Sequence, residues 1–270
     1  MTTHDSVKHA DLSPVFGGVA RQVQDKIPLV LLHGWGMNRC IWEPLLPGLG
    51  QRFAVTAPDL PGHGQRQAEP LGTLEQAVAS LLPLIPAGAV VLGWSMGGIL
   101  AQQLAWQHPE RVRALILVGS TPRFMNGDGW EYGLALQVLD GFAANLQLDQ
   151  TAALKRFFAL QFMGLKTGLR ELNALRDRVL ARPASPQALV DGLDILRHSD
   201  LRRYRPRQPA LWLLGQLDRL IPVALAQGLL ALDVPPARIQ VMAHAAHVPF
   251  VTHTEAFLQQ VLTFLDQQDL

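Results

Sequence analysis

The sequence predicts an α/β fold in which a mostly parallel sheet is flanked by helices and carries an inserted helical cap. Short apolar runs alternate with helix-like segments through residues 1–120 and again through residues 208–270. This alternation is typical of parallel strands buried between helices. Residues 121–207 contain helical patterns but no strand pattern. We therefore expect a split core, 1–120 and 208–270, interrupted by a helical cap or lid, 121–207.

The elements of the first core segment follow from apolar runs that end in Gly- or Pro-rich loops. Thr73 is a suitable N-cap for a helix that Pro83 and Pro86 close. The expected elements are an opening strand or hairpin at 15–24, strands at 29–32, 53–57, 89–92 and 114–118, and helices at 73–84 and 99–107.

The cap and the second core segment are assigned in the same way. Helix-like windows fill the cap, and the alternation of strand and helix resumes after it. The expected cap helices span 130–146, 151–163, 167–181 and 185–198, and the later core elements are strands at 210–214 and 238–242 and helices at 223–232 and 254–266.

Composition narrows the class of protein. The 270 residues are 49% hydrophobic with a formal net charge of +1, which does not favour nucleic-acid binding or disorder. Cys40 is the only cysteine, so an intramolecular disulfide and a cysteine-based metal cluster are excluded. No apolar run reaches membrane-spanning length, and the first residues lack a signal-peptide pattern. We expect a cytoplasmic protein that has no membrane partner and is a monomer.

A candidate nucleophile lies in Gly93-Trp94-Ser95-Met96-Gly97-Gly98, between an apolar strand and a helix. A serine on such a sharp turn is held at the carboxyl end of a sheet, exposed to substrate. Gly93 and Gly97 permit the turn, because side chains there would collide across it. The motif therefore predicts that Ser95 is a nucleophile.

A serine nucleophile needs a histidine as its base and a carboxylate to orient that histidine. His244 and His247 follow the last predicted strand, and we favour His247, which lies further into the loop and precedes Val248-Pro249. Asp218 is the only carboxylate in the loop after strand 210–214. Asp59 precedes the nucleophile and is expected to tie down its own turn.

Two backbone N–H groups are expected to form an oxyanion hole. Met96 follows the nucleophile, and Trp35 lies in the loop after an earlier strand. The Trp35 side chain is also expected to contact substrate. Ester hydrolysis on this triad needs no metal and no organic cofactor.

The motifs together resemble the α/β-hydrolase superfamily over essentially the whole core. They are His33-Gly34-Trp35-Gly36, Asp59-Leu60-Pro61-Gly62-His63-Gly64, the Ser95 motif, and the Asp218 and His247 loops. Within that superfamily, residues 29–36, 92–98 and 245–250 resemble the pimeloyl-ACP methyl ester carboxylesterases of biotin synthesis, and residues 156–164 resemble that family's cap motif. The resemblance implies hydrolysis of the methyl ester on a pimeloyl chain that is still attached to acyl carrier protein.

The net charge of the predicted cap bears on whether it binds an acyl carrier protein. Residues 121–207 hold thirteen Lys or Arg against nine Asp or Glu, so the cap is +4 and the rest of the chain is −3. A basic cap would attract an acidic carrier, although a solvated helix face gives the same count. The resemblance implies a set of cap arginines for the carrier, but only Arg156 falls in register. Lys155, Lys166, Arg170 and Arg176 are nearby and out of register.

Apolar cap residues are candidates to line an acyl channel, with ordinary helix packing as the alternative. They are Phe124, Phe157, Phe158, Phe162 and Met163. Phe157 is the leading candidate for substrate binding, and Phe158 and Phe162 are further candidates. Two other enzymatic activities fit the same triad, those of a broad short-chain carboxylesterase and of a carbon–carbon bond hydrolase. A small-molecule receptor on this fold is the alternative that is not an enzyme.

Overall fold

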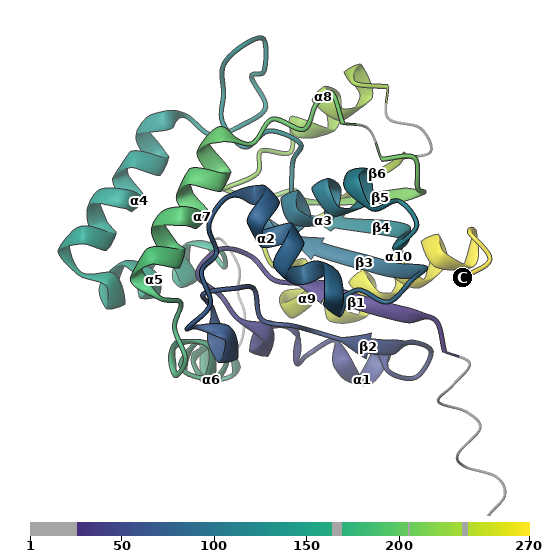
Figure 1. The fold of residues 1–270 in the computed structure, drawn as a ribbon, viewed down its shortest axis with the longest axis horizontal. Helices are drawn as coiled ribbons and strands as arrows, with labels where there is room; N and C mark the ends of the chain where they lie inside the picture. The colour runs from purple at the N-terminus through teal and green to yellow at the C-terminus, as the bar shows by residue number, and fades with distance from the viewer. Residues whose placement is uncertain (1–25, 164–168, 205, 234–236) are drawn as a thin grey trace, which may run out of the picture.

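The computed structural model describes residues 26–163, 169–204, 206–233 and 237–270, so the strand or hairpin expected at 15–24 lies outside the described residues. Within them, one six-stranded parallel sheet has the order β2-β1-β3-β4-β5-β6 (Figure 1). The strands are β1 (Pro28–Leu32), β2 (Ala54–Thr56), β3 (Ala89–Trp94), β4 (Val112–Val118), β5 (Ala210–Gly215) and β6 (Ala237–Met242). Every residue of β3 and β5 is buried, which explains their continuous apolar sequences.

Helices cover both faces of the sheet. In Figure 1, α2 (Leu74–Leu81) and α3 (Met96–Gln107) lie in front of it, and α9 (Pro249–Thr252) and α10 (Thr254–Asp266) lie behind it. Thr73 caps α2 as expected, through a capping box with Gln76. The remaining core helices are α1 (Leu46–Leu49), α8 (Leu225–Ala231) and the short 3₁₀ turns η1 (Arg39–Trp42), η2 (Gly64–Arg66) and η3 (Leu82–Leu84).

Four helices stand between β4 and β5 in the sequence, and we call them the cap. They are α4 (Leu136–Leu148), α5 (Gln150–Leu160), α6 (Leu169–Leu180) and α7 (Pro186–His198). They gather beyond one end of the sheet, towards which the strands' carboxyl ends point (Figure 1). The Trp35 indole N–H donates to the carbonyl of Leu189 at 2.9 Å, and the Asn38 amide donates to that of Val179 at 2.8 Å. These hydrogen bonds join the cap to the loop after β1.

Several helix boundaries differ from the sequence prediction by three residues or more: α2 ends at Leu81 and α5 at Leu160, and the starts of α4 and α3 also differ. Helix α4 begins at Leu136, not near residue 130, because Leu134 is bridged to the chain before it: its N–H donates to the Phe124 carbonyl at 2.8 Å and its carbonyl accepts the Asn126 N–H at 2.9 Å. Backbone groups that are used in such a bridge are not available to the hydrogen-bond ladder of a helix. Helix α3 begins at Met96, three residues earlier than expected.

No helix among the described residues is long and apolar enough to span a bilayer.

Candidate active site

Ser95 lies at the junction of β3 and α3 in a strained conformation, with φ 55° and ψ −121°. Three hydrogen bonds hold this turn. The Ser95 N–H donates to Val118 at 2.9 Å, and the Ser95 carbonyl accepts from the Gly98 N–H at 2.9 Å and the Ser120 hydroxyl at 2.8 Å. The neighbouring ends of β3 and β4 therefore fix the direction in which the Ser95 side chain leaves the backbone.

The glycines of the motif are required by close backbone contacts, as the sequence predicted. A Cβ on Gly93 would lie 2.5 Å from the carbonyl oxygen of Gly97. A Cβ on Gly97 would lie 2.2 Å from that of Leu32. Both distances are far below van der Waals contact, so any side chain would push the helix away from the sheet.

Asp218 and His247 meet beyond the carboxyl ends of β5 and β6. The Asp218 carboxylate lies 2.7 Å from His247 Nδ1, and its other oxygen accepts the N–H groups of Leu220 and Ile221 at 2.8 and 2.9 Å. An ionised carboxylate beside Nδ1 favours the tautomer in which Nδ1 carries the proton and Nε2 is an acceptor. His247 is 1% exposed, and its Nε2 has no hydrogen-bond partner among the described residues.

The backbone and ring of His247 are also held in place. The Trp94 indole N–H donates to the His247 carbonyl at 2.9 Å, and the two rings lie 5.4 Å apart. A Cβ on Gly119 would come within 3.0 Å of His247 Nδ1, so β4 also ends close against this ring. Trp94 and Gly119 are positioning contacts that the sequence argument did not assign.

The two competing residues lie elsewhere. His244 has no hydrogen bond to Asp218, and its backbone N–H donates to the Gln216 side chain at 3.1 Å. Asp59 accepts the Gln65 N–H at 2.7 Å, which fixes its own turn as expected from the sequence, and it also accepts the Arg39 N–H at 2.7 Å, which joins that turn to η1. Asp59 is 4% exposed.

The N–H groups of Trp35 and Met96 make no hydrogen bond to other described residues. Met96 is the first residue of α3, where a helix leaves its N–H groups without intrahelical acceptors. Free N–H groups at a helix N-terminus stabilise a negative oxygen.

An almost wholly apolar pocket surrounds Ser95, with free volume of only about 10 Å³. Two of the expected aromatic residues, Phe124 and Phe157, line it together with Trp35. The Trp35 and Phe157 rings meet edge to face at 4.8 Å. The other lining residues are Leu134, Leu139, Phe142, Leu193, Leu196 and Leu220, which the sequence argument did not single out.

The remaining cap candidates lie away from this pocket. Phe158 and Phe162 are buried and their rings contact each other at a tilt, with centroids 5.0 Å apart, but neither lines the pocket. Met163 is half exposed. Arg156 is exposed on α5, where its guanidinium lies 3.5 Å from the Asn145 side chain. Lys166 lies outside the described residues.

The comparisons with known proteins agree with this architecture. The family model described as alpha/beta hydrolase fold matches residues 27–254, and the chain belongs to this family. Among individual relatives, the chain is 40% identical over 240 residues to the pimeloyl-[acyl-carrier protein] methyl ester esterase of Photobacterium profundum, covering 88% of this chain and 94% of the relative. The protein of the same name from Salmonella enteritidis is 41% identical over 238 residues, covering 87% and 92%.

Solved structures share the fold. An esterase from Exiguobacterium antarcticum superposes with a TM-score of 0.80 at 23% identity, covering 89% of this chain and 92% of that one. A hydrolase from Pseudomonas aeruginosa superposes with a TM-score of 0.74 at 27% identity, covering 89% and 90%. At 23% identity, the likeness to the first of these structures supports the fold alone.

Proposed function

We propose that this chain is a serine carboxylesterase that hydrolyses the methyl ester of a pimeloyl chain carried by acyl carrier protein. The observation that carries the proposal is the 40% identity, over most of both chains, to relatives named for that reaction. The apolar lining of the pocket at Ser95 supports it, because burying a methylene chain against such a surface is favourable; with only about 10 Å³ free, the walls must separate to admit the chain.

The proposed mechanism assigns one role to each group at the site. Ser95 Oγ attacks the ester carbonyl while His247 Nε2 takes the hydroxyl proton. The N–H groups of Trp35 and Met96 hold the oxyanion. His247 gives the proton to the leaving methoxide, which departs as methanol, and then activates water to release the acid from Ser95. Asp218 keeps Nδ1 protonated and stabilises the imidazolium.

The product differs from the substrate in a way that this pocket distinguishes. Hydrolysis converts a neutral ester into a carboxylate, and the residues that line the pocket include no cationic side chain. Leaving an ionised carboxylate unpaired in an apolar, dry site is costly. The new charge therefore favours release of the acid once Ser95 has been freed.

The cap, proposed as residues 121–207, is the part of the chain that contacts acyl carrier protein in this proposal, and Arg156 makes that contact. The exposed guanidinium of Arg156 supports this, since among the described residues the neighbour at hydrogen-bond distance is the uncharged Asn145. A cytoplasmic location and a monomeric state stay predictions from the sequence.

The test compares methyl pimeloyl-ACP with simple p-nitrophenyl esters, using the native protein and Ser95→Ala. We expect the native protein to cleave the carrier-bound ester and Ser95→Ala to lose at least about a thousandfold in kcat. Cleavage of the simple esters alone would favour a broad short-chain esterase. Tight ligand binding without cleavage of any ester would favour a receptor.

The carrier contact is tested with Arg156→Glu, and Lys155→Glu is the matched control. Both side chains are exposed on α5 and both changes reverse one charge. We expect Arg156→Glu to raise KM for the ACP ester several-fold while leaving a free short ester unaffected, with a smaller effect from Lys155→Glu. Equal losses on both substrates would show that Arg156 serves folding or the pocket.

A further inference from the structure

A second cavity, of about 510 Å³, lies between α2, α3 and α7. Helix α7 separates it from the Ser95 pocket. Leu193 and Leu196 line the Ser95 pocket, whereas Asp191, Ile195 and His198 line the second cavity. The latter three repeat at helical spacing, so they form one face of α7. The volume is within the range of small-molecule sites.

The second cavity is negatively charged. Its lining includes four carboxylates and no Lys or Arg. Asp200 is neutralised from outside the cavity by Arg202 and Arg123, at 2.6 and 2.8 Å. The other three carboxylates form no ion pair among the described residues, and they are Glu75, Asp191 and Asp194. Their combined field attracts a cation and repels an anion.

The N-terminus of α2 also borders this cavity, but the protein's own groups already cap it. The Asp191 carboxylate accepts the Gly72 N–H at 2.9 Å. Thr73 and Gln76 form the capping box. Because these backbone donors are used, the helix end offers little to an anionic ligand.

Gln103 supplies an independent sign of a ligand. It lines the cavity from α3 and is 5% exposed, yet its buried side-chain oxygen has no hydrogen-bond partner among the described residues. Its neighbour Gln102 shows the usual arrangement, with its amide donating to the carbonyls of Gly98 and Thr121 at 3.0 and 3.2 Å. Buried amides are seldom left unpaired, because the unmade hydrogen bond destabilises the protein.

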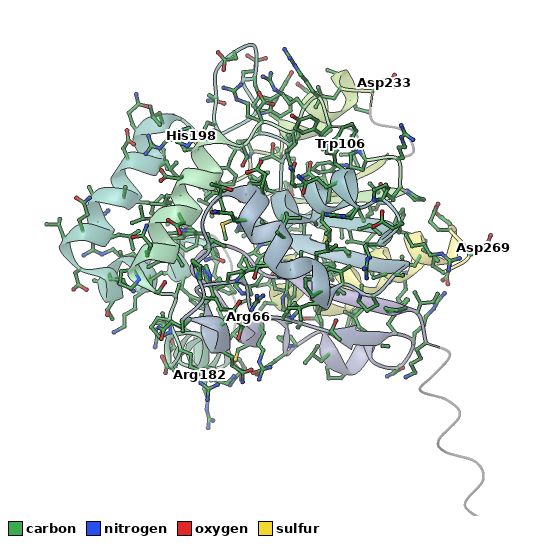
Figure 2. All side chains as sticks on the ribbon, viewed as in Figure 1. Arg66, Trp106, Arg182, His198, Asp233 and Asp269 are labelled. Carbon is green, nitrogen blue, oxygen red and sulfur yellow. The ribbon has the colours of Figure 1, made fainter. Side chains whose placement is uncertain are left out.

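The rest of the lining mixes polar and apolar residues and includes an aromatic ring. Tyr204 stacks on Trp106 with ring centroids 5.1 Å apart and an interplanar angle of 22°. Trp106 and His198 are labelled in Figure 2. A fixed aromatic face near carboxylates suits a positively charged group with an apolar body. Leu74, Ile195 and Leu201 supply the apolar wall.

We propose that this cavity binds a small organic cation, an ammonium group on an apolar body, at a site separate from Ser95. The ammonium lies among Glu75, Asp191 and Asp194 and donates to the Gln103 amide, while the apolar body packs on Tyr204 and Leu201. The binding does not involve the esterase chemistry.

The test uses three probes of similar shape and different charge: phenethylammonium, 2-phenylethanol and phenylacetate. Their binding to the full chain is measured by titration calorimetry and by ligand-observed NMR. We expect phenethylammonium to bind and the other two to bind at least roughly tenfold more weakly. Equal binding of the three probes, or no binding of the cation, would overturn the proposal, whatever the esterase activity.

Two variants locate the site. Asp194→Asn removes one exposed charge whose carboxylate makes no hydrogen bond within the described residues, so the fold should be retained. It should weaken the binding of phenethylammonium several-fold, whereas Glu255→Gln, an equal charge change on α10, should not. Gln103→Met tests the amide and should also weaken the binding of phenethylammonium. If Gln103→Met only raises the melting temperature and leaves binding intact, Gln103 is a packing residue and the proposed contact is wrong.

Discussion

Ser120 is the side chain that completes the strained turn at Ser95. It is fully buried, and its hydroxyl donates to the Ser95 carbonyl at 2.8 Å. A strained backbone conformation such as that of Ser95 persists only when several surrounding contacts hold it in place. The Gly98 N–H also bonds that carbonyl, so loss of Ser120 would loosen the turn without removing its last restraint.

Ser120→Ala should therefore lower kcat roughly tenfold with little change in KM, because the nucleophile is misdirected while the pocket is intact. The free energy of unfolding should fall by about 1 kcal/mol. Steady-state kinetics on a p-nitrophenyl ester and urea unfolding would measure the two effects. Ser199→Ala, at another buried serine, is the control and should leave kcat unchanged. A rise in KM with unchanged kcat would assign Ser120 to the pocket instead.

At the scale of elements, α7 approaches the loop after β1 so closely that only glycine fits at their contact. A Cβ on Gly192 would lie 2.5 Å from Trp35 Cδ1 and 3.2 Å from Met96 Sδ. The Trp35 ring cannot easily move, because its N–H is bonded to Leu189 on the same helix. Gly141 on α4 is the opposite case, since a Cβ there meets no atom within 4 Å.

Gly192→Ala should destabilise the protein by about 1–3 kcal/mol through overpacking. It should also reduce kcat/KM, because Trp35 supplies both a pocket wall and a proposed oxyanion donor. Gly141→Ala should instead stabilise by about 0.5–1 kcal/mol and leave kinetics unchanged, since alanine favours helix where space is open. Denaturant unfolding and esterase assays on the pair would test this. Similar effects from the two substitutions would contradict the contact.

The same elements show what local sequence can predict. The strands were predictable because a strand buried on both faces must be apolar throughout, as β3 and β5 are. Asp218 and His247 could be placed because parallel strands end at one edge of the sheet, and the structure brings their side chains together. Phe124 and Phe157 were among the predicted wall residues of the Ser95 pocket, but its aliphatic walls were not predictable. Leu139 and Leu193 have the helical spacing of ordinary core residues, and only tertiary packing turns them towards Ser95.

At the scale of the whole molecule, two buried histidines couple folding to pH. His33 and His63 are fully buried, with ring centroids 5.3 Å apart. Burial lowers the pKa of His33 from 6.5 to about 4. Burial, and then the neighbouring His33, lowers the pKa of His63 to about 3. Each ring also has a fixed role when neutral: His33 Nε2 accepts the Leu60 N–H at 3.0 Å, and His63 Nδ1 bonds the Pro61 carbonyl at 2.9 Å.

These pKa values set the sign of the pH dependence. Between the unfolded pKa of 6.5 and the lowered folded values, the unfolded chain binds protons that the folded chain does not. The stabilising contribution of the neutral rings is therefore complete above about pH 6.5 and is lost as pH falls towards the folded values. By about pH 5, the loss should be about 2 kcal/mol for each histidine.

Urea unfolding at about pH 7 and about pH 5 would measure this loss directly. In His63→Gln, where one of the two groups no longer titrates, the difference between the two pH values should shrink by about half. The exposed His198 is the control, and His198→Gln should keep the full difference. A native protein equally stable at both pH values would mean that the buried rings accept protons without cost. The loops that carry His33 and His63, after β1 and β2, would then have to open to water before the rest of the molecule unfolds.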